Sequence, residues 1–228
     1  PLVRLPFIQK LTSRKQKTHP PYRLASDLFI VEAKKDGNLF VTDKNTGKTW
    51  QGLNSFRDGG DCGDEYNYCP PVTDDILQPR LREVSISKDS VVKSMLLKMD
   101  LITPATLSPD RKSRSSDTVV STITSRISLV NGNPRIDIQT TVDNHARDHR
   151  LRVHFPAPFS VDQAEHDGHF EVLKRELGIP AFDETWVEHP RPEVPQRAFT
   201  SISDGHDRLT VANRGLPEVE VLKSQDGT

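Results

Sequence analysis

Short segments in which apolar and polar residues alternate constrain the fold of this chain most strongly. Residues 135–144 place Ile136 and Ile138 on one side of an extended chain and Asp137 on the other. An alternation with period two is typical of a half-buried β-strand, whereas an amphipathic helix repeats every 3.6 residues. Since no long stretch follows the helical period, the pattern predicts an all-β protein.

Turn residues separate these segments in the way expected of antiparallel hairpins. Asp36 and Gly37 stand between the β-rich run 28–31 and the run 39–43. Asp-Gly between two such runs is a strong hairpin signal. Gly47 marks a second turn, so the region predicts an antiparallel meander.

The rest of the chain predicts more strands of the same kind. Residues 103–117 are polar and interrupted by proline, and they predict a long loop. Together the segments favour one large antiparallel β-sandwich over residues 26–228, preceded by a basic connecting segment or edge strand over residues 1–25. The further strands are expected at 81–102 (two strands around a turn at 88–90), 118–130, 135–144, 149–155, 168–175, 197–203, 208–213 and 217–223.

Charge and hydropathy narrow the range of partners. The 228 residues include 31 Lys and Arg against 32 Asp and Glu, for a net charge of −1, which gives no reason to expect a nucleic acid or an acidic membrane as partner. No apolar run reaches the roughly 18 residues of a transmembrane helix, and no signal peptide stands at the start. We therefore expect a cytoplasmic protein without a membrane anchor.

The segment 56-FRDGGDCGDEYNYCPP-71 is acidic and aromatic, and it allows several interpretations. Its acids Asp58, Asp61, Asp64 and Glu65 suggest calcium, but their spacing does not fit an EF-hand. The carboxylates could instead cap backbone amides in Asx turns. They could also bind sugar hydroxyls.

A sugar site would explain the aromatic residues of this segment. Tyr66 and Tyr68 offer an apolar ring face and a hydroxyl, and the glycines allow a ligand to approach the backbone. Cys62 and Cys69 lack the spacing of a zinc site, so we interpret them as free thiols, although a bridge between them is possible.

Two further segments carry charged side chains without a catalytic pattern. The alternation in 149–155 sends His149 and His154 to opposite faces, which disfavours a metal site. It favours an ion-pair and hydrogen-bond network of Asp148 with Arg150 or Arg152. Arg214 precedes Gly215 at a turn, where it could bind a ligand or simply lie at the surface. No G-x-S-x-G, P-loop or H-E-x-x-H occurs, so we expect no catalytic residue in this chain.

Five segments, taken in order, resemble the C-terminal β region of glycoside hydrolase family 38, the α-mannosidases, including the bacterial branch with mannosylglycerate hydrolases. The resemblance covers the chain from about residue 25 to its end. The segments are 36-DGNLFVTDKNTG-47, 58-DGGDCGDEYNYCPP-71, 143-DNHARDHRLRVHFP-156, 185-TWVEHPRPEVPQ-196 and 213-NRGLPEVEV-221.

The resemblance implies a galactose-mutarotase-like sandwich that supports a catalytic α/β domain of the same polypeptide. In the family, that domain holds a zinc ion and the aspartate nucleophile of a retaining mechanism that acts on mannosides. This chain has no G-H-x-D string, so we expect the catalytic domain to be absent, the zinc to lie outside this chain, and the chain alone to be inactive. We also expect a β domain truncated at its C-terminal end.

The resemblance also implies roles for four side chains. The tyrosine that matches Tyr66 reaches into the sugar pocket, and Arg214 is a second contributor. Asp61 and Asp64 would shape the loop or meet sugar hydroxyls, and Cys62 and Cys69 receive no role. An exposed apolar patch, hidden against the catalytic domain or in a homodimer, would accompany such a fragment.

Two alternatives remain open from the sequence. The chain could be a free-standing carbohydrate-binding module that uses Tyr66, Tyr68 and Trp186 as sugar platforms. It could also be a structural sandwich in which the segment 56–71, the acidic loop, serves only as an interdomain contact.

Overall fold

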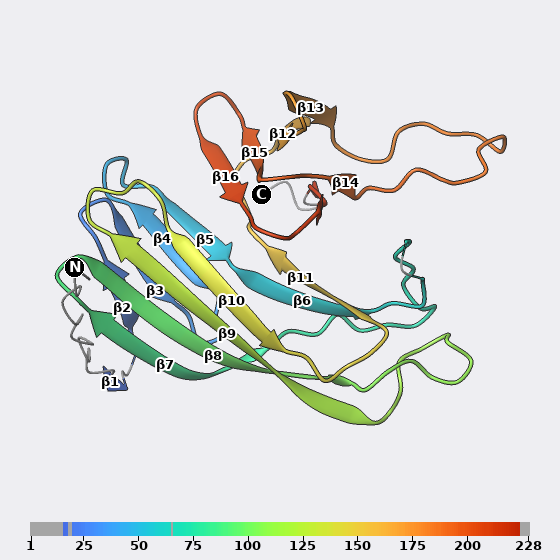
Figure 1. The fold of residues 1–228 in the computed structure, drawn as a ribbon, viewed down its shortest axis with the longest axis horizontal. Coiled ribbons are helices and arrows are strands. Elements are labelled where there is room, and N and C mark those ends of the chain that lie inside the picture. Colours follow the sequence, from blue (N-terminus) through green and yellow to red (C-terminus); the bar gives the residue numbers. More distant parts are fainter. Residues whose placement is uncertain (1–15, 18–19, 65, 224–228) are drawn as a thin grey trace, which may run out of the picture. The chain divides into compact units, whose positions relative to one another are not determined.

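The computed structural model describes residues 16–17, 20–64 and 66–223, and within them it contains strands and no helix. The chain divides into two compact units, Pro1–His154 and Phe155–Thr228. Figure 1 shows antiparallel sheets in both. The all-β prediction is therefore confirmed. The described residues include no helix long and apolar enough to cross a membrane.

A five-stranded antiparallel sheet is the largest element of the first unit (Figure 1). Its two longest strands have 13 residues each, and they pair over their full length from Val92 opposite Val130 to Pro104 opposite Thr118. In order across the sheet, the strands are β1 (Gln16–Lys17), β7 (Arg80–Lys88), β8 (Val92–Pro104), β9 (Thr118–Val130) and β10 (Asp137–Asp143).

A four-stranded meander forms the second sheet of this unit. Gly37 and Gly47 occupy its turns with φ of 87° and 74°, a region that glycine adopts without the steric cost of a Cβ atom. The predicted meander is confirmed. Its strands follow the chain order β2 (Tyr22–Ala25), β3 (Phe29–Ala33), β4 (Leu39–Asp43) and β5 (Thr49–Leu53).

The apolar faces of these two sheets form the core. Period-two alternation buries Met95, Leu97, Met99 and Leu101 along β8, while the meander contributes Leu24, Val31 and Leu39. The two sheets lie close together at Gly37. A Cβ atom on this residue would lie 2.7 Å from the sulfur of Met99. Lys93 Nζ also donates to the carbonyl oxygen of Ala25 across the sheets at 2.9 Å. This unit is therefore a sandwich, as predicted.

A two-stranded ribbon of β6 (Ser55–Gly60) and β11 (His149–His154) completes the first unit. Gly60 pairs with His149 and Ser55 with His154. The prediction that residues 56–60 belong to the acidic loop is wrong, because β6 extends to Gly60 and the loop begins at Asp61. The Asp58-Gly59-Gly60 string has the composition of a turn, but it is held extended by its pairing with β11 and by backbone hydrogen bonds that Asp58 exchanges with Leu77.

The second unit contains a four-stranded sheet and a small two-stranded one. Its predicted strand 168–175 starts later, at Val172, and the strand before it was missed. His166 is buried and bonds the hydroxyl of Thr200 at 2.9 Å. The larger sheet has the order β13 (Val172–Glu176), β12 (Gln163–Asp167), β15 (Phe199–Ser203), β16 (Arg208–Ala212), and β14 (Val194–Pro195) pairs with β17 (Glu218–Val219).

The expected division at residue 25 stays a prediction. The described part of residues 1–25 contains β1 and β2, which are edge strands of their sheets. The basic run 11–17 lies almost entirely outside the described residues.

Candidate functional site

The loop that follows β6 carries three of the four predicted site residues. Asp61, Asp64 and Tyr66 lie between the end of β6 and Pro71. Arg214 belongs to the second unit, where it follows β16. The structure thus groups three candidates on one loop and leaves the fourth on a separate element.

Two aspartates shape this loop by accepting hydrogen bonds from its backbone. Asp61 Oδ1 accepts from the amides of Gly63 at 2.9 Å and Cys69 at 3.0 Å. Asp64 Oδ1 accepts from the amides of Tyr66 and Asn67, each at 2.9 Å. These amide donors lower the pKa of Asp64. The Asx-turn interpretation is confirmed for both carboxylates.

The two tyrosines of the loop have different surroundings. Tyr66 is 81% exposed, so its ring and hydroxyl are presented to solvent. Tyr68 lies against β11, with the guanidinium carbon of Arg150 4.4 Å from the ring centroid. Such a cation–π contact anchors a ring, and burial raises the pKa of the Tyr68 phenol. Tyr68 therefore fixes the loop, while Tyr66 remains available to a ligand.

Beneath the loop, Asp58 is fully buried between two basic side chains. Arg114 Nη2 donates to Asp58 Oδ2 at 2.7 Å, and His149 Nδ1 lies 2.5 Å from Asp58 Oδ1. The other ring nitrogen of His149 lies 3.1 Å from Asn144 Oδ1. A buried carboxylate needs such partners, because desolvation of an unpaired charge is very unfavourable.

A second aspartate, Asp74, connects this network to the segment that follows the acidic loop. Asp74 Oδ2 accepts from the amide of Gly60 at 2.7 Å, and its other oxygen lies 3.9 Å from Arg114 Nη1. A Cβ atom on Gly60 would lie 2.9 Å from the ring of Pro71. The end of β6, the loop 105–117 and the segment after the acidic loop are thus locked together.

The His, Cys, Asp and Glu side chains do not form a metal site in the described part of the chain. No group of three or more His, Cys, Asp or Glu side chains is placed to hold an ion there. His149 faces Asp58, whereas the pKa of His154 is lowered by burial and by Arg152 and Arg57. Asp148 forms an ion pair with Arg111 at 3.7 Å. Glu65, a calcium candidate from the sequence, lies outside the described residues.

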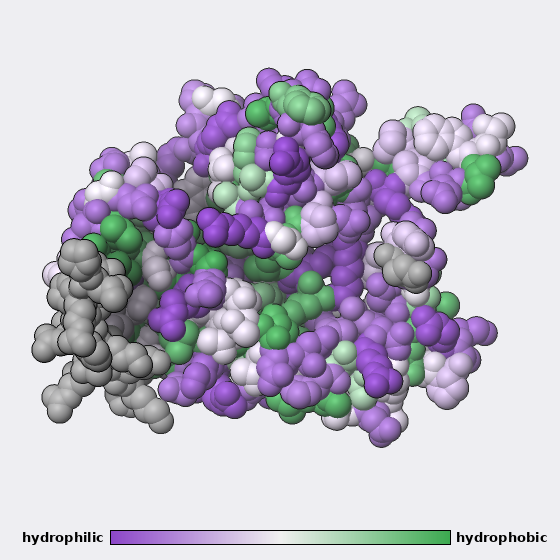
Figure 2. Space-filling view, in the orientation of Figure 1, coloured by the Kyte–Doolittle hydropathy of each residue, from purple (hydrophilic) through white to green (hydrophobic). Residues whose placement is uncertain are grey.

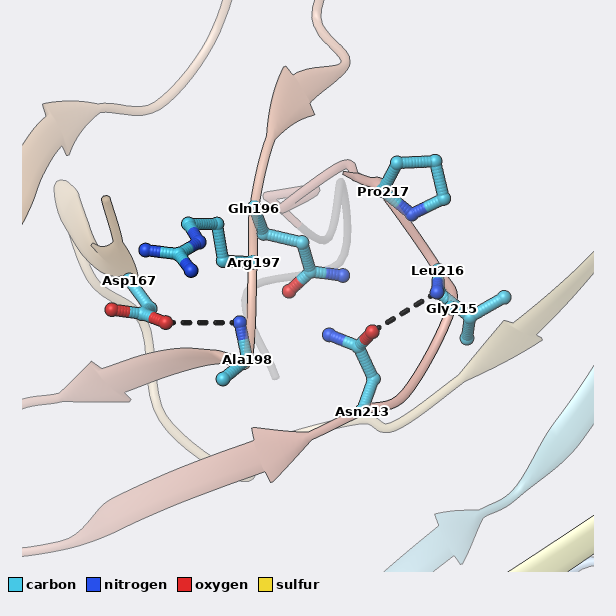
Figure 3. A pocket seen from close by; sticks show the side chains of 8 residues that line it. All are labelled: Asp167, Gln196, Arg197, Ala198, Asn213, Gly215, Leu216 and Pro217. Atoms are coloured by element: carbon cyan, nitrogen blue, oxygen red, sulfur yellow. Dashed lines mark hydrogen bonds between the residues drawn. The ribbon is translucent and has the colours of Figure 1, made fainter. Parts of the chain in front are cut away.

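Arg214 occupies the predicted turn, since the next residue, Gly215, has a φ of 84°. It is exposed and borders an open depression of about 530 Å³ without lining it. In Figure 3, the Asn213 side chain accepts from the amide of Leu216 at 3.1 Å and so holds the turn. Arg214 is therefore a surface residue at a hydrogen-bonded turn. Its contact with a ligand stays a prediction.

Exposed apolar side chains occur in both units. Tyr66 and Val72 are exposed in the acidic-loop region, and Phe170 and Val187 are each 99% exposed in the second unit. The face in Figure 2 is mostly hydrophilic, with apolar residues in small groups. The expected extended patch and homodimer stay predictions.

The residues that support the acidic loop are not evident from the sequence. Arg114 lies in a stretch read as a polar loop, and it meets Asp58 from 56 residues away. The stacking of Arg150 on Tyr68 also joins distant segments. Only the alternation in β11 indicated that the side chains of His149 and Arg150 point to opposite faces of the strand.

Comparison with known proteins agrees with this architecture. The family model "Glycosyl hydrolases family 38 C-terminal domain" matches residues 24–228. A curated relative from Halalkalibacterium halodurans, named "Putative mannosylglycerate hydrolase", is 25% identical over an alignment 218 residues long that covers 87% of this chain and 24% of the relative.

Solved structures are similar over the same region. An α-mannosidase from Enterococcus faecalis V583 superposes with a TM-score of 0.79 and 26% identity over 93% of this chain and 25% of that protein. A second family 38 protein from Enterococcus faecalis, at 24% identity and a TM-score of 0.77, supports the fold over 91% of this chain and 25% of its own. The chain spans about a quarter of the length of these relatives. It belongs to the C-terminal domain family of the family 38 glycosyl hydrolases.

Proposed function

We propose that this chain is the β domain that completes the sugar-binding site of an α-mannosidase and supports its catalytic domain. The observation that carries the proposal is the exposed Tyr66 on a loop anchored by a buried ion network. Family membership and the relatives named α-mannosidase and mannosylglycerate hydrolase support an α-mannoside as the proposed substrate class.

Tyr66 would act by positioning the sugar. Its ring can pack on the apolar C–H face of a mannose residue, and its hydroxyl can donate to an oxygen near the reacting carbon. The amides capped by Asp61 and Asp64 keep the loop in one conformation before the substrate arrives. A donor fixed in advance stabilises the transition state without reorganisation at the moment of reaction.

The metal and the nucleophile belong, in this proposal, to the remainder of the complete enzyme. The described residues of this chain include no cluster of donors that fits a zinc ion. On the ground of the family resemblance, we place the zinc and the retaining chemistry on the catalytic α/β domain, and we assign this chain binding and support only.

Hydrolysis of a chromogenic α-mannoside tests this division. We expect turnover by the product of the complete reading frame and none above the buffer rate by residues 1–228 alone. Isothermal titration of the isolated chain with mannose is the companion measurement. Turnover by the isolated chain would contradict the proposal, whereas sugar binding by that chain in the absence of any hydrolysis by the complete protein would favour a carbohydrate-binding module.

A further inference from the structure

Cys62 and Cys69 stand face to face across the base of the acidic loop. Their sulfur atoms are 3.3 Å apart, and the amide of Cys62 donates to the carbonyl oxygen of Cys69 at 2.7 Å. Both cysteines are free thiols in the structure. A disulfide requires a sulfur–sulfur distance of about 2.05 Å, so small side-chain rotations would suffice to form one.

The backbone of the loop is already closed at the position where a disulfide would join it. Asp61 Oδ1 accepts from the amide of Cys69 and from that of Gly63, on the two sides of the loop base. A Cβ atom on Gly63 would lie 1.8 Å from the carbonyl oxygen of Asn67, which shows how tightly the loop folds on itself. Loop closure is therefore achieved before any covalent bond forms.

The two thiols are not equivalent. Cys69 is exposed and Cys62 is half-buried. The Cys62 thiol donates a hydrogen bond to the Cys69 sulfur, and this bond is the main cause that raises the pKa of Cys62. Cys69 is consequently the sulfur that meets an oxidant from solution first, with Cys62 in place as the resolving thiol.

We propose that Cys62 and Cys69 form a reversible dithiol–disulfide site that exchanges with low-molecular-weight disulfides. The Cys69 thiolate attacks one sulfur of the small disulfide, whose S–S bond breaks, and one small thiolate leaves. The Cys62 thiolate then attacks the Cys69 sulfur, breaks the mixed disulfide and releases the second small thiolate. The protein loses two electrons and two protons, and the small disulfide is reduced to two thiols.

Such a bond would enclose Tyr66 in a covalent ring. The loop is held in the reduced protein by the hydrogen bonds of Asp61 and Asp64. A disulfide would add a constraint that does not depend on those carboxylates. The thiol exchange itself does not rest on the proposed mannosidase role, so its success or failure can be judged without an activity assay.

Peptide mass spectrometry of the complete protein tests the site directly. Trypsin releases both cysteines on one peptide, residues 58–80, because no Lys or Arg lies between Arg57 and Arg80. After exposure to glutathione disulfide and acid quenching, we expect this peptide to lose about 2 Da. Cys62→Ser should instead trap the mixed disulfide on Cys69, with a gain of about 305 Da.

Hydrogen exchange gives a second readout. Amides of residues 63–68 should exchange at least roughly threefold more slowly in the oxidised protein than in the reduced protein, and the doubly substituted Cys62→Ser, Cys69→Ser protein should show no such difference. A wild-type peptide that carries two glutathione groups, forms a dimer between chains, or stays reduced while Cys62→Ser accepts glutathione would overturn the proposal.

Discussion

At the scale of single residues, Asp58 links segments that are far apart in the chain. It is fully buried and contacts Arg114 from the long loop and His149 from β11. We expect Asp58→Asn to lower the free energy of unfolding by about 3 kcal/mol, because it leaves the buried Arg114 guanidinium without its main counter-charge. Urea unfolding measures the loss.

The control for this substitution is Asp75→Asn, which removes the same charge at an exposed position nearby. Exposed substitutions of this kind usually change stability by less than about 0.5 kcal/mol. Equal effects of Asp58→Asn and Asp75→Asn would show that the buried network does not stabilise the loop region.

Asp64 makes the loop sensitive to acid. The amides of Tyr66 and Asn67 hold the pKa of Asp64 below its ordinary value of 3.8. A carboxyl group with a depressed pKa in the folded state stabilises that state above its unfolded pKa, and this contribution is lost as the pH falls through the folded value. NMR titration of the Asp64 carboxyl carbon should give a midpoint below 3.8.

The Tyr66 amide shift should follow the Asp64 titration, and Asp64→Asn should remove that response. A carboxyl midpoint at or above the ordinary value would mean that the caps do not form in solution.

The two Asx turns could be expected from sequence because each uses only neighbours along the chain. The Asp58–Arg114 pair could not, since no local rule selects a partner 56 residues away.

At the scale of elements, strands with clear alternation were predicted almost residue by residue. The predicted strands 39–43 and 118–130 match β4 and β9, where apolar and polar positions alternate and clear turn residues follow. β6 was missed because Asp58-Gly59-Gly60 has a turn-like composition. β12 was missed because its buried positions are Ala164 and His166, which give little hydrophobic signal.

The glycines of β6 are needed because of what packs against them. We expect Gly60→Ala to lower the free energy of unfolding by about 1–3 kcal/mol, since its Cβ atom would lie 2.9 Å from Pro71 and 3.1 Å from Arg114. The amide resonances of residues 61–71 should shift with it. Heteronuclear NMR and urea unfolding measure both effects.

Gly132→Ala is the control for Gly60→Ala, because it separates the effect of steric crowding on stability from the effect of backbone strain. Gly132 has open space around its Cβ position but a φ of 75°, so the substitution should cost about 1 kcal/mol through strain alone and leave the acidic loop unchanged. If Gly60→Ala also left the loop resonances unchanged, the close packing of β6 against Pro71 would not position the loop.

At the scale of the whole molecule, this chain corresponds to one region of a longer polypeptide in its relatives. It spans about a quarter of their length. The described residues provide an anchored, exposed tyrosine but no metal-binding cluster of their own. We propose that the chemistry belongs to the catalytic domain of the complete protein and sugar positioning to this domain, with the hydroxyl of Tyr66 as the central contact.

The most direct test is the kcat/KM of the complete protein for a chromogenic α-mannoside, compared between wild type, Tyr66→Phe and the control Tyr22→Phe on β2. A hydrogen bond to a developing charge predicts a loss of roughly 10- to 100-fold for Tyr66→Phe. Tyr22→Phe should retain wild-type turnover. If Tyr66→Phe also retained wild-type turnover, the acidic loop would have a packing role only.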